Sequence, residues 1–297
     1  MRAGYLYGLA AYFMWGLFPL YFDLLERSGA VEIVAYRALF SFVFCLILIP
    51  VARRWRTLLA ALRRPKLAGT LAVAGFIVAL NWTLYVYAVV NGHTLDAAMG
   101  YFINPLISAA LGLVVLREKL SRAQQVAFGF GIAAVVALVV GYGHFPWLAV
   151  AIAFTFALYA LVKKQAGNHV GPLEGFTIET TAMLPVAVGY LLWLSERGTV
   201  DFTTPYAALV ALSGPITAVP LLLFAAAAPR VSMAAIGMMQ YVTPTMQFLI
   251  GALILREPLP PERLVGFVLV WIAVAIFTAD AVARGRRMSR IARAIDG

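Results

Sequence analysis

The chain has 297 residues, of which 63% are apolar and only 12% are charged, and its mean hydropathy is +0.90. A soluble protein has about a quarter of its residues charged, so this composition excludes a soluble domain and indicates a polytopic membrane protein. The net charge of +10 lies mainly in short links and in the C-terminal tail. There it sets membrane orientation and meets anionic lipid, so no nucleic-acid partner is expected.

A helix needs about 20 apolar residues to cross the bilayer core, and that rule divides the chain into ten expected spans. In chain order they lie near 4–25, 31–51, 68–90, 97–116, 124–142, 146–163, 172–194, 206–228, 233–255 and 263–281. Residues 52–66 form a basic link in which Leu58, Leu59 and Leu62 share one face. We therefore expect this link to be an amphipathic segment at the membrane interface.

The fourth and ninth expected spans resemble each other. Met99–Leu120 recurs in the second half of the chain as Met238–Leu259, with the proline, the central glycine and the Arg-Glu exit at the same places. The matching pairs are Pro105 and Pro244, Gly112 and Gly251, Arg117 and Arg256, and Glu118 and Glu257. A repeat of this kind indicates one unit used twice, with each proline expected to break its helix.

Most of the Lys and Arg residues fall on one side of the membrane if the N-terminus is placed inside. Since each half has five spans, the second copy must be inverted. The predicted fold is an all-α membrane protein with ten transmembrane helices in a 5+5 inverted repeat, with both termini inside, as in secondary transporters. We expect a first repeat at 1–143, a second at 144–283 and a basic cytoplasmic tail at 284–297.

Polar residues recur on one face of the two repeated spans. The fourth span carries three of them at i, i+3 and i+7, which are Tyr101, Asn104 and Ser108. Their counterparts at the same places of the ninth span are also polar: Gln240, Thr243 and Gln247. Two such stripes would line a solute cavity from both halves, and the alternative is that they form interhelical hydrogen bonds.

The third span adds aromatic and amide side chains near the same depth. Asn81, Trp82 and Tyr85 would form an asymmetric wall suited to a flat or amphipathic organic solute. The alternative is ordinary aromatic packing. Together with the two stripes, they complete the predicted substrate-binding residues.

Arg37 and Glu179 are the ionisable residues expected deepest in the spans, where an unpaired charge costs about 2.5–3.5 kcal/mol. We expect them to pair, either structurally or with a role in coupling or gating. His93 and Asp96 are further candidates for coupling or gating, because histidine titrates near physiological pH. The alternative for these two residues is helix capping.

Two spans begin with capping sequences. Thr94 followed by Asp96 predicts the N-terminal cap of the fourth span, and Ser121 with Gln124 predicts a capping box for the fifth. Glu118 and Glu257 are expected to form local ion pairs at the membrane edge. No metal site is expected, because no Cys/His cluster has ligand spacing. No cofactor is expected either, and ATP drive within this chain is not expected, because no phosphate-binding Walker sequence occurs.

Several strings in the chain resemble the RarD group, which belongs to the EamA branch of the drug/metabolite transporter superfamily. They are Gly16–Phe22 (GLFPLYF), Arg37, Asn81–Trp82, Asn91–His93, Gly100–Leu106 (GYFINPL), Glu179–Thr180 and Gln240–Thr245 (QYVTPT). The resemblance covers nearly the whole chain except the basic tail. It implies a ten-helix permease of the bacterial inner membrane made of two five-helix repeats, and it does not identify the transported compound.

The leading functional hypothesis is a secondary transporter for a small organic solute, with export as one open direction. The expected partners are that solute and the lipid bilayer, and a homodimer stays open. One alternative is a membrane enzyme acting on lipid-like substrates, although the clustered acids or histidines that such an enzyme needs are missing. Another alternative is a non-transporting membrane sensor.

Overall fold

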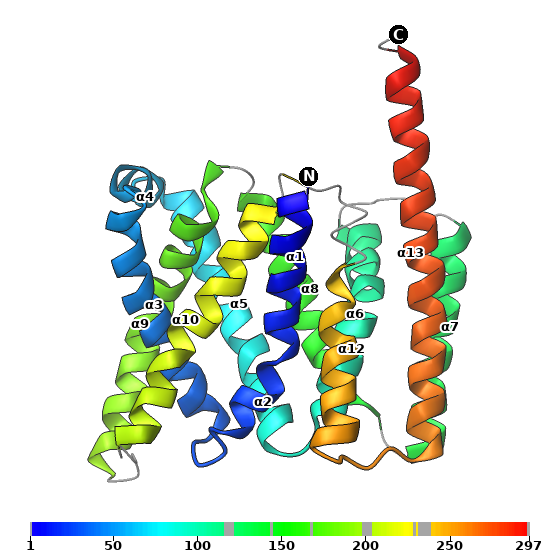
Figure 1. The fold of residues 1–297 in the computed structure, drawn as a ribbon, viewed down its shortest axis with the longest axis horizontal. Helices are drawn as coiled ribbons and strands as arrows, with labels where there is room; N and C mark the ends of the chain where they lie inside the picture. The colour runs from blue at the N-terminus through cyan, green and yellow to red at the C-terminus, as the bar shows by residue number, and fades with distance from the viewer. Residues whose placement is uncertain are drawn as a thin grey trace.

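The computed structural model describes residues 2–115, 122–142, 145–166, 169–197, 204–227, 230 and 239–295. The regular elements in these ranges are helices that run side by side as a bundle (Figure 1). The N-terminal end of the chain and the C-terminal end of the last helix lie on the same side of the bundle, and the last helix extends beyond it.

The helices fall into two sets along the chain. The first set consists of α1 (Arg2–Gly16), α2 (Phe18–Asp23), α3 (Ala30–Val51), α4 (Trp55–Leu62), α5 (Pro65–Val90), α6 (Thr94–Val115) and α7 (Arg122–Tyr142). The second set consists of α8 (Trp147–Ala166), α9 (Pro172–Glu196), α10 (Thr204–Ala227), α12 (Val242–Leu249), the π-helical η3 (Ile250–Ile254) and α13 (Pro261–Ile295). Pro65, Pro172 and Pro261 each occupy a first helical position, where no amide donor is needed.

Seven of these helices are long and apolar enough to cross a membrane: α3, α5, α6, α7, α9, α10 and α13. Shorter apolar helices lie at Trp147–Lys163 and Val242–Ile254. The prediction of an all-helical membrane protein is confirmed. A bilayer core offers no water to backbone amides and carbonyls, so apolar segments of this length satisfy their hydrogen bonds internally as helices.

Proline affects two of the predicted spans differently from our expectation. The first span is divided at Leu17, where α1 ends and α2 begins with Pro19 near its start. Pro105 does not break the fourth span, because α6 runs through it from Thr94 to Val115. The ninth span is interrupted near its proline, as expected: residues 239–240 are helical, Tyr241 is a turn, and α12 begins at Val242 with Pro244 in its first turn and continues as η3. Its expected first residues, 233–238, lie outside the described residues.

The basic link contains α4, as its amphipathic pattern predicts. Leu58 and Ala61 face the protein and are buried against Ile49 and Leu71, whereas Leu59 and Leu62 are exposed. The predicted common face is therefore wrong in detail, because only one of its three leucines packs on the bundle. The side chains of Leu59 and Leu62 point away from the bundle.

Neighbouring helices are related by the repeat. In the first half α5 packs on α8 and α9, and in the second half its counterpart α10 packs on α1 and α3. Likewise α6 packs on α8, and α12 packs on α1. Counterparts also meet each other directly, in the pairs α3 with α9, α6 with α12, and α7 with α13. Exchanging the halves therefore reproduces the principal helix contacts.

Two glycines mark equivalent close approaches between the halves. A Cβ atom added to Gly75 on α5 would lie 2.8 Å from the backbone oxygen of Glu179 on α9. A Cβ atom added to Gly214 on α10 would lie closer still to the backbone oxygen of Phe40 on α3. The offset between the two repeated spans also relates Gly75 to Gly214 and Phe40 to Glu179. Small residues at such crossings let helix backbones approach closely in a membrane.

We predict that Gly75→Ala and Gly214→Ala each destabilise the protein by about 1–3 kcal/mol, because a methyl group at either position must push two helix backbones apart. The measurement is thermal unfolding of the purified protein in detergent. Gly69→Ala on the same helix α5 is the matched control, since a Cβ atom there meets nothing within 4 Å. Equal melting temperatures for all three variants would contradict the prediction.

Candidate functional site

Arg37 on α3 lies among aromatic rings at the contact between the halves. Its guanidinium carbon is 4.0 Å from the Trp82 ring centroid and 5.2 and 5.3 Å from those of Phe18 and Phe22. Its Nε donates a 2.7 Å hydrogen bond to Thr217 Oγ1 on α10. The side chain is buried, and its Nη1 has no hydrogen-bond partner among the described residues. Ring faces and one hydroxyl group therefore surround this cation.

Tyr85 on α5 connects this region to the second half. Its ring centroid lies 5.9 Å from that of Phe22 and 5.6 Å from that of Tyr101. Gln247 on α12 donates a 3.1 Å hydrogen bond from Nε2 to the Tyr85 hydroxyl, whereas its own Oε1 is buried and finds no partner in the part of the chain that the structure describes. We define the central cluster as these connected side chains: Phe22, Arg37, Trp82, Tyr85, Tyr101 and Gln247.

The repeated residues Asn104 and Thr243 make equivalent interhelical bonds. Asn104 Nδ2 donates to the backbone oxygen of Ala153 on α8 at 3.0 Å. Thr243 Oγ1 donates to the backbone oxygen of Tyr12 on α1 at 2.8 Å. In both halves, the polar stripe therefore holds its own helix to the first helix of the other half. At this one repeated position, the structure therefore shows the alternative to a solute cavity, which is interhelical hydrogen bonding.

The other predicted solute contacts lie beside the central cluster. Asn81 Nδ2 donates to Ile152 O and Thr155 Oγ1 on α8, both at 2.9 Å, and its Oδ1 is buried without a partner. Ser108 and Gln240 are half-buried on α6 and just before α12. Of the nine predicted binding residues, the structure joins four in the central cluster: Trp82, Tyr85, Tyr101 and Gln247.

The predicted ion pair between Arg37 and Glu179 is wrong. Glu179 on α9 is fully buried, with Oε1 bound by Lys163 Nζ and Oε2 accepting a 3.1 Å hydrogen bond from the Tyr159 hydroxyl. Both partners come from α8, where Lys163 belongs to the helix and not to the following link. Sequence spacing could not reveal this pair, because it depends on which helix packs beside α9.

Glu257 joins the end of the second repeated span to the start of the first. Its Oε1 and Oε2 accept hydrogen bonds from the backbone amides of Thr94 and Leu95, at 2.5 and 2.8 Å. Arg263 at the start of α13 pairs with Asp96 at 2.6 Å. We call this set the α6 clamp: Thr94, Leu95, Asp96, Glu257 and Arg263. A carboxylate is well placed here, since a helix N-terminus carries free amides and a positive dipole.

The clamp corrects two predictions about capping. Thr94 does not cap α6, because it is the first helical residue and its buried hydroxyl has no partner. Glu257 does not pair with the adjacent exposed Arg256 but caps α6 from the other half. Its repeat counterpart Glu118 and the predicted cap Ser121 lie outside the described residues. Arg263 was missed because its charge was read only as an orientation signal.

His93 lies next to the clamp. Its Nδ1 is 3.4 Å from Oδ2 of Asp96, whose Oδ1 is held by Arg263. The predicted neighbours His93 and Asp96 are therefore in contact, and the clamp supplies Asp96 with a permanent cationic partner. A role for His93 in coupling or gating remains a prediction.

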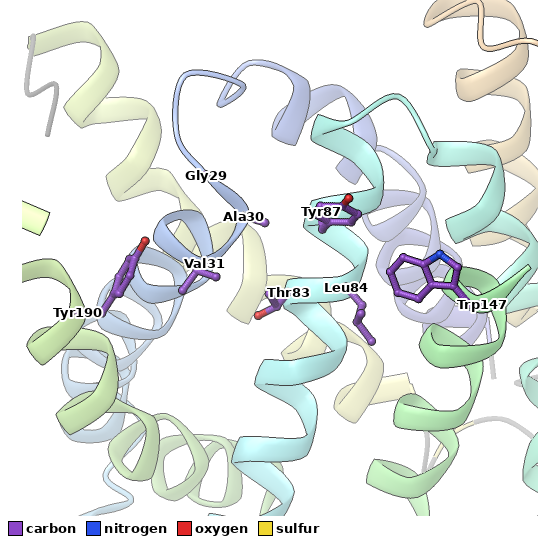
Figure 2. Close-up of a pocket in the computed structure, with 8 residues that line it drawn as sticks. All are labelled: Gly29, Ala30, Val31, Thr83, Leu84, Tyr87, Trp147 and Tyr190. Carbon is purple, nitrogen blue, oxygen red and sulfur yellow. The ribbon is translucent and has the colours of Figure 1, made fainter. Parts of the chain in front are cut away.

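A recess of about 380 Å³ opens beside the central cluster without including it. It lies between the starts of α3 and α8 and the C-terminal parts of α5 and α9 (Figure 2). Its α5 residues are Thr83, Leu84 and Tyr87, which lie next to the cluster residues Trp82 and Tyr85 along that helix. The recess is largely apolar, and none of the predicted site residues lines it.

Two similar helical halves, joined through buried polar and aromatic contacts, define this chain as a multi-pass membrane protein. The model of the EamA-like transporter family matches it twice, at residues 2–140 and 146–279. The chain belongs to this family of bacterial transporters, and the alternative of a membrane enzyme is excluded with it.

Its relatives include the RarD proteins. The chain is 44% identical over 289 residues to protein RarD of Streptomyces exfoliatus, covering 96% of this chain and 91% of that one. It is 38% identical over 292 residues to protein RarD of Escherichia coli, covering 97% and 98%. A protein of known crystal structure, only 18% identical, matches its fold over 97% of this chain and 99% of that one, with a TM-score of 0.57. The predicted resemblance to RarD proteins is confirmed.

We predict that Glu257→Ala lowers stability by about 1–3 kcal/mol, because two buried amides at the start of α6 lose their acceptors. Thermal unfolding in detergent measures the loss. Glu262→Ala is the matched control, since Glu262 is an exposed carboxylate in the first turn of α13. If both variants melt at the wild-type temperature, the cap contributes nothing to stability.

We predict a coupling free energy of about 0.5–3 kcal/mol between Lys163 and Glu179 in a double-mutant cycle. Lys163→Met or Glu179→Gln alone leaves one partner without its ion pair, and the double variant relieves that cost. The same cycle with Arg37→Gln in place of Lys163→Met is the comparison and should give additive losses. Coupling of Glu179 to Arg37 but not to Lys163 would mean that the pairing is wrong.

Proposed function

We propose that this protein is a secondary transporter that moves a small organic solute across the inner membrane by alternating access between two inverted five-helix repeats. Residues 1–143 and 144–283 form the repeats, with both termini and the tail at 284–297 on the cytoplasmic side. Ten spans follow if α1 with α2, α8, and α12 with η3 cross the membrane beside the seven long apolar helices.

The α6 clamp supports the inversion. Glu257 follows the C-terminal end of η3, yet it caps the N-terminus of α6, the repeat counterpart of α12 and η3. Two counterparts that meet end to start run in opposite directions. The equivalent glycine contacts of α5 with α9 and of α10 with α3 agree with a two-fold relation between the halves.

The central cluster carries the proposal of transport. It is built from α2, α3, α5 and α6 of the first half and α12 of the second, and it holds a buried cation and an unsatisfied amide oxygen. Ionisable residues inside a membrane protein are costly and mark substrate pathways by default. In inverted-repeat transporters the solute site lies between the repeats. For gating, we propose that the α6 clamp closes the outer side of the transporter.

The basic segments support the orientation. The N-terminus, α4 and the far end of α13 lie together on one side of the bundle (Figure 1). Arg53, Arg54 and Arg56 flank or begin α4, and α13 ends in a basic stretch. Positively charged segments face the cytoplasm, so the opposite side, which holds the α6 clamp, faces outward.

We predict that a disulfide across the α6 clamp stops transport reversibly. The Cβ of Thr94 and a Cβ built at Gly251 are 3.4 Å apart, close to the spacing of disulfide-linked residues. In a Cys45→Ala background, Thr94→Cys with Gly251→Cys should lose uptake under oxidation and regain it with dithiothreitol, because the outer side can no longer open.

The assay uses proteoliposomes and a panel of labelled anionic, neutral and cationic organic solutes, with and without a pH gradient. Each single-cysteine variant, treated with the same oxidant, is the control and should keep its uptake. Full uptake by the cross-linked protein would reject opening at the clamp. No uptake of any solute by the folded wild type would reject the transporter itself.

A further inference from the structure

Arg37 is a buried cation with no counter-ion among the described residues. The side chain is only 3% exposed, and its one hydrogen bond within that part of the chain is donated by Nε to neutral Thr217. Its Nη1 has no partner, and no carboxylate of the described residues forms an ion pair with it. A guanidinium group has five N–H donors, so most of this fork is unused.

The surroundings of Arg37 do not neutralise its charge. Trp82 and the two phenylalanines offer ring faces, which attract a cation but carry no net negative charge. The ionisable side chains that influence it most are the phenols of Tyr21, Tyr85 and Tyr101, which are neutral at physiological pH. Glu179 does not act as the counter-ion of Arg37, because its two carboxylate oxygens bind Lys163 and Tyr159.

We propose that the solute itself is the missing counter-ion: a small organic monocarboxylate with an apolar or aromatic body, bound by the Arg37 guanidinium. This inference rests on the proposed function and names the substrate class of its site. A planar guanidinium matches a carboxylate in two parallel hydrogen bonds. One cation balances one negative charge, so a monoanion fits better than a phosphate dianion.

The rest of the central cluster fits the body of such a solute. The Trp82, Tyr85 and Tyr101 rings provide flat apolar contact area, which favours aromatic or alkyl groups. Gln247 Oε1 is a buried acceptor that no described residue pairs with, so it would accept a hydrogen bond from a hydroxyl or ammonium group on the solute. The rings contact each other in this structure, and binding therefore accompanies separation of the halves around them.

The test measures binding to the purified full-length protein, so that it does not depend on transport. Thermal stabilisation in detergent is titrated with phenylacetate, hexanoate and acetate, and with the matched phenylacetamide and phenethylamine. We expect wild type to bind phenylacetate and hexanoate at least tenfold more tightly than acetate, which lacks a body. Wild type should also bind phenylacetate at least tenfold more tightly than it binds phenylacetamide or phenethylamine.

Variants assign this preference to Arg37. Arg37→Gln should bind phenylacetate and phenylacetamide equally, and Arg37→Lys should keep a reduced preference for the anion because it keeps the charge without the fork. Arg197→Gln is the matched control, since Arg197 also lies 4.0 Å from a tryptophan ring, that of Trp193, but is exposed. It should bind as wild type does.

Failure of this inference and failure of the proposed function are distinguishable. Preference of wild type for phenylacetamide or phenethylamine, no binding of any carboxylate, or an anion preference that survives Arg37→Gln would overturn the carboxylate site. Uptake of a neutral or cationic solute in proteoliposomes would then leave the transporter intact. Tight carboxylate binding without uptake of any solute would instead support the site and reject transport.

Discussion

The close approach of helix backbones at Gly75 and Gly214 is the contact on which the arrangement of the two halves depends. It brings α5 against α9 and α10 against α3, so that side chains from both halves meet around α3. Trp82 lies two turns beyond Gly75 on α5, and Thr217 lies one turn beyond Gly214 on α10. Both contact Arg37. The glycines thus place the aromatic and hydroxyl groups that surround the cation.

Polar side chains inside the bundle fall into two groups by what they bind. Asn104 and Thr243 donate to backbone carbonyls of α8 and α1, and such bonds hold helices together at modest gain, about 0.6 kcal/mol each on average. Arg37 and Gln247 keep buried polar atoms that have no partner within the described ranges. Because an unsatisfied buried group costs free energy, the second group is the better indication of where a solute binds.

Membership of the EamA-like family and kinship with RarD proteins give the class of activity, and the site must give its chemistry. Related folds carry different functions on different side chains. The helix contacts that relate the halves supply only a framework with two similar faces. The single buried arginine of the central cluster breaks that symmetry, since Phe176 occupies the equivalent position of the second half. The proposed preference for an anionic solute rests on this one side chain.

The sequence by itself determined that this is a membrane protein, where most of its apolar helices lie along the chain, and that the chain contains a repeat. Long apolar runs can satisfy their backbones in a bilayer only as helices, and the repeat is visible in Met99–Leu120 and Met238–Leu259. The sequence also singled out Trp82, Tyr85, Tyr101 and Gln247, which the structure joins in the central cluster, because polar or aromatic residues at membrane depth stand out against an apolar background.

Only the tertiary structure decided which of these side chains meet. Glu179 pairs with Lys163 and not Arg37, Glu257 caps a helix of the other half, and α6 continues through Pro105. Hydropathy and charge fix where a helix lies along the chain and across the membrane. They do not fix which neighbour it packs against or how it is rotated, and a partner within hydrogen-bond distance depends on both.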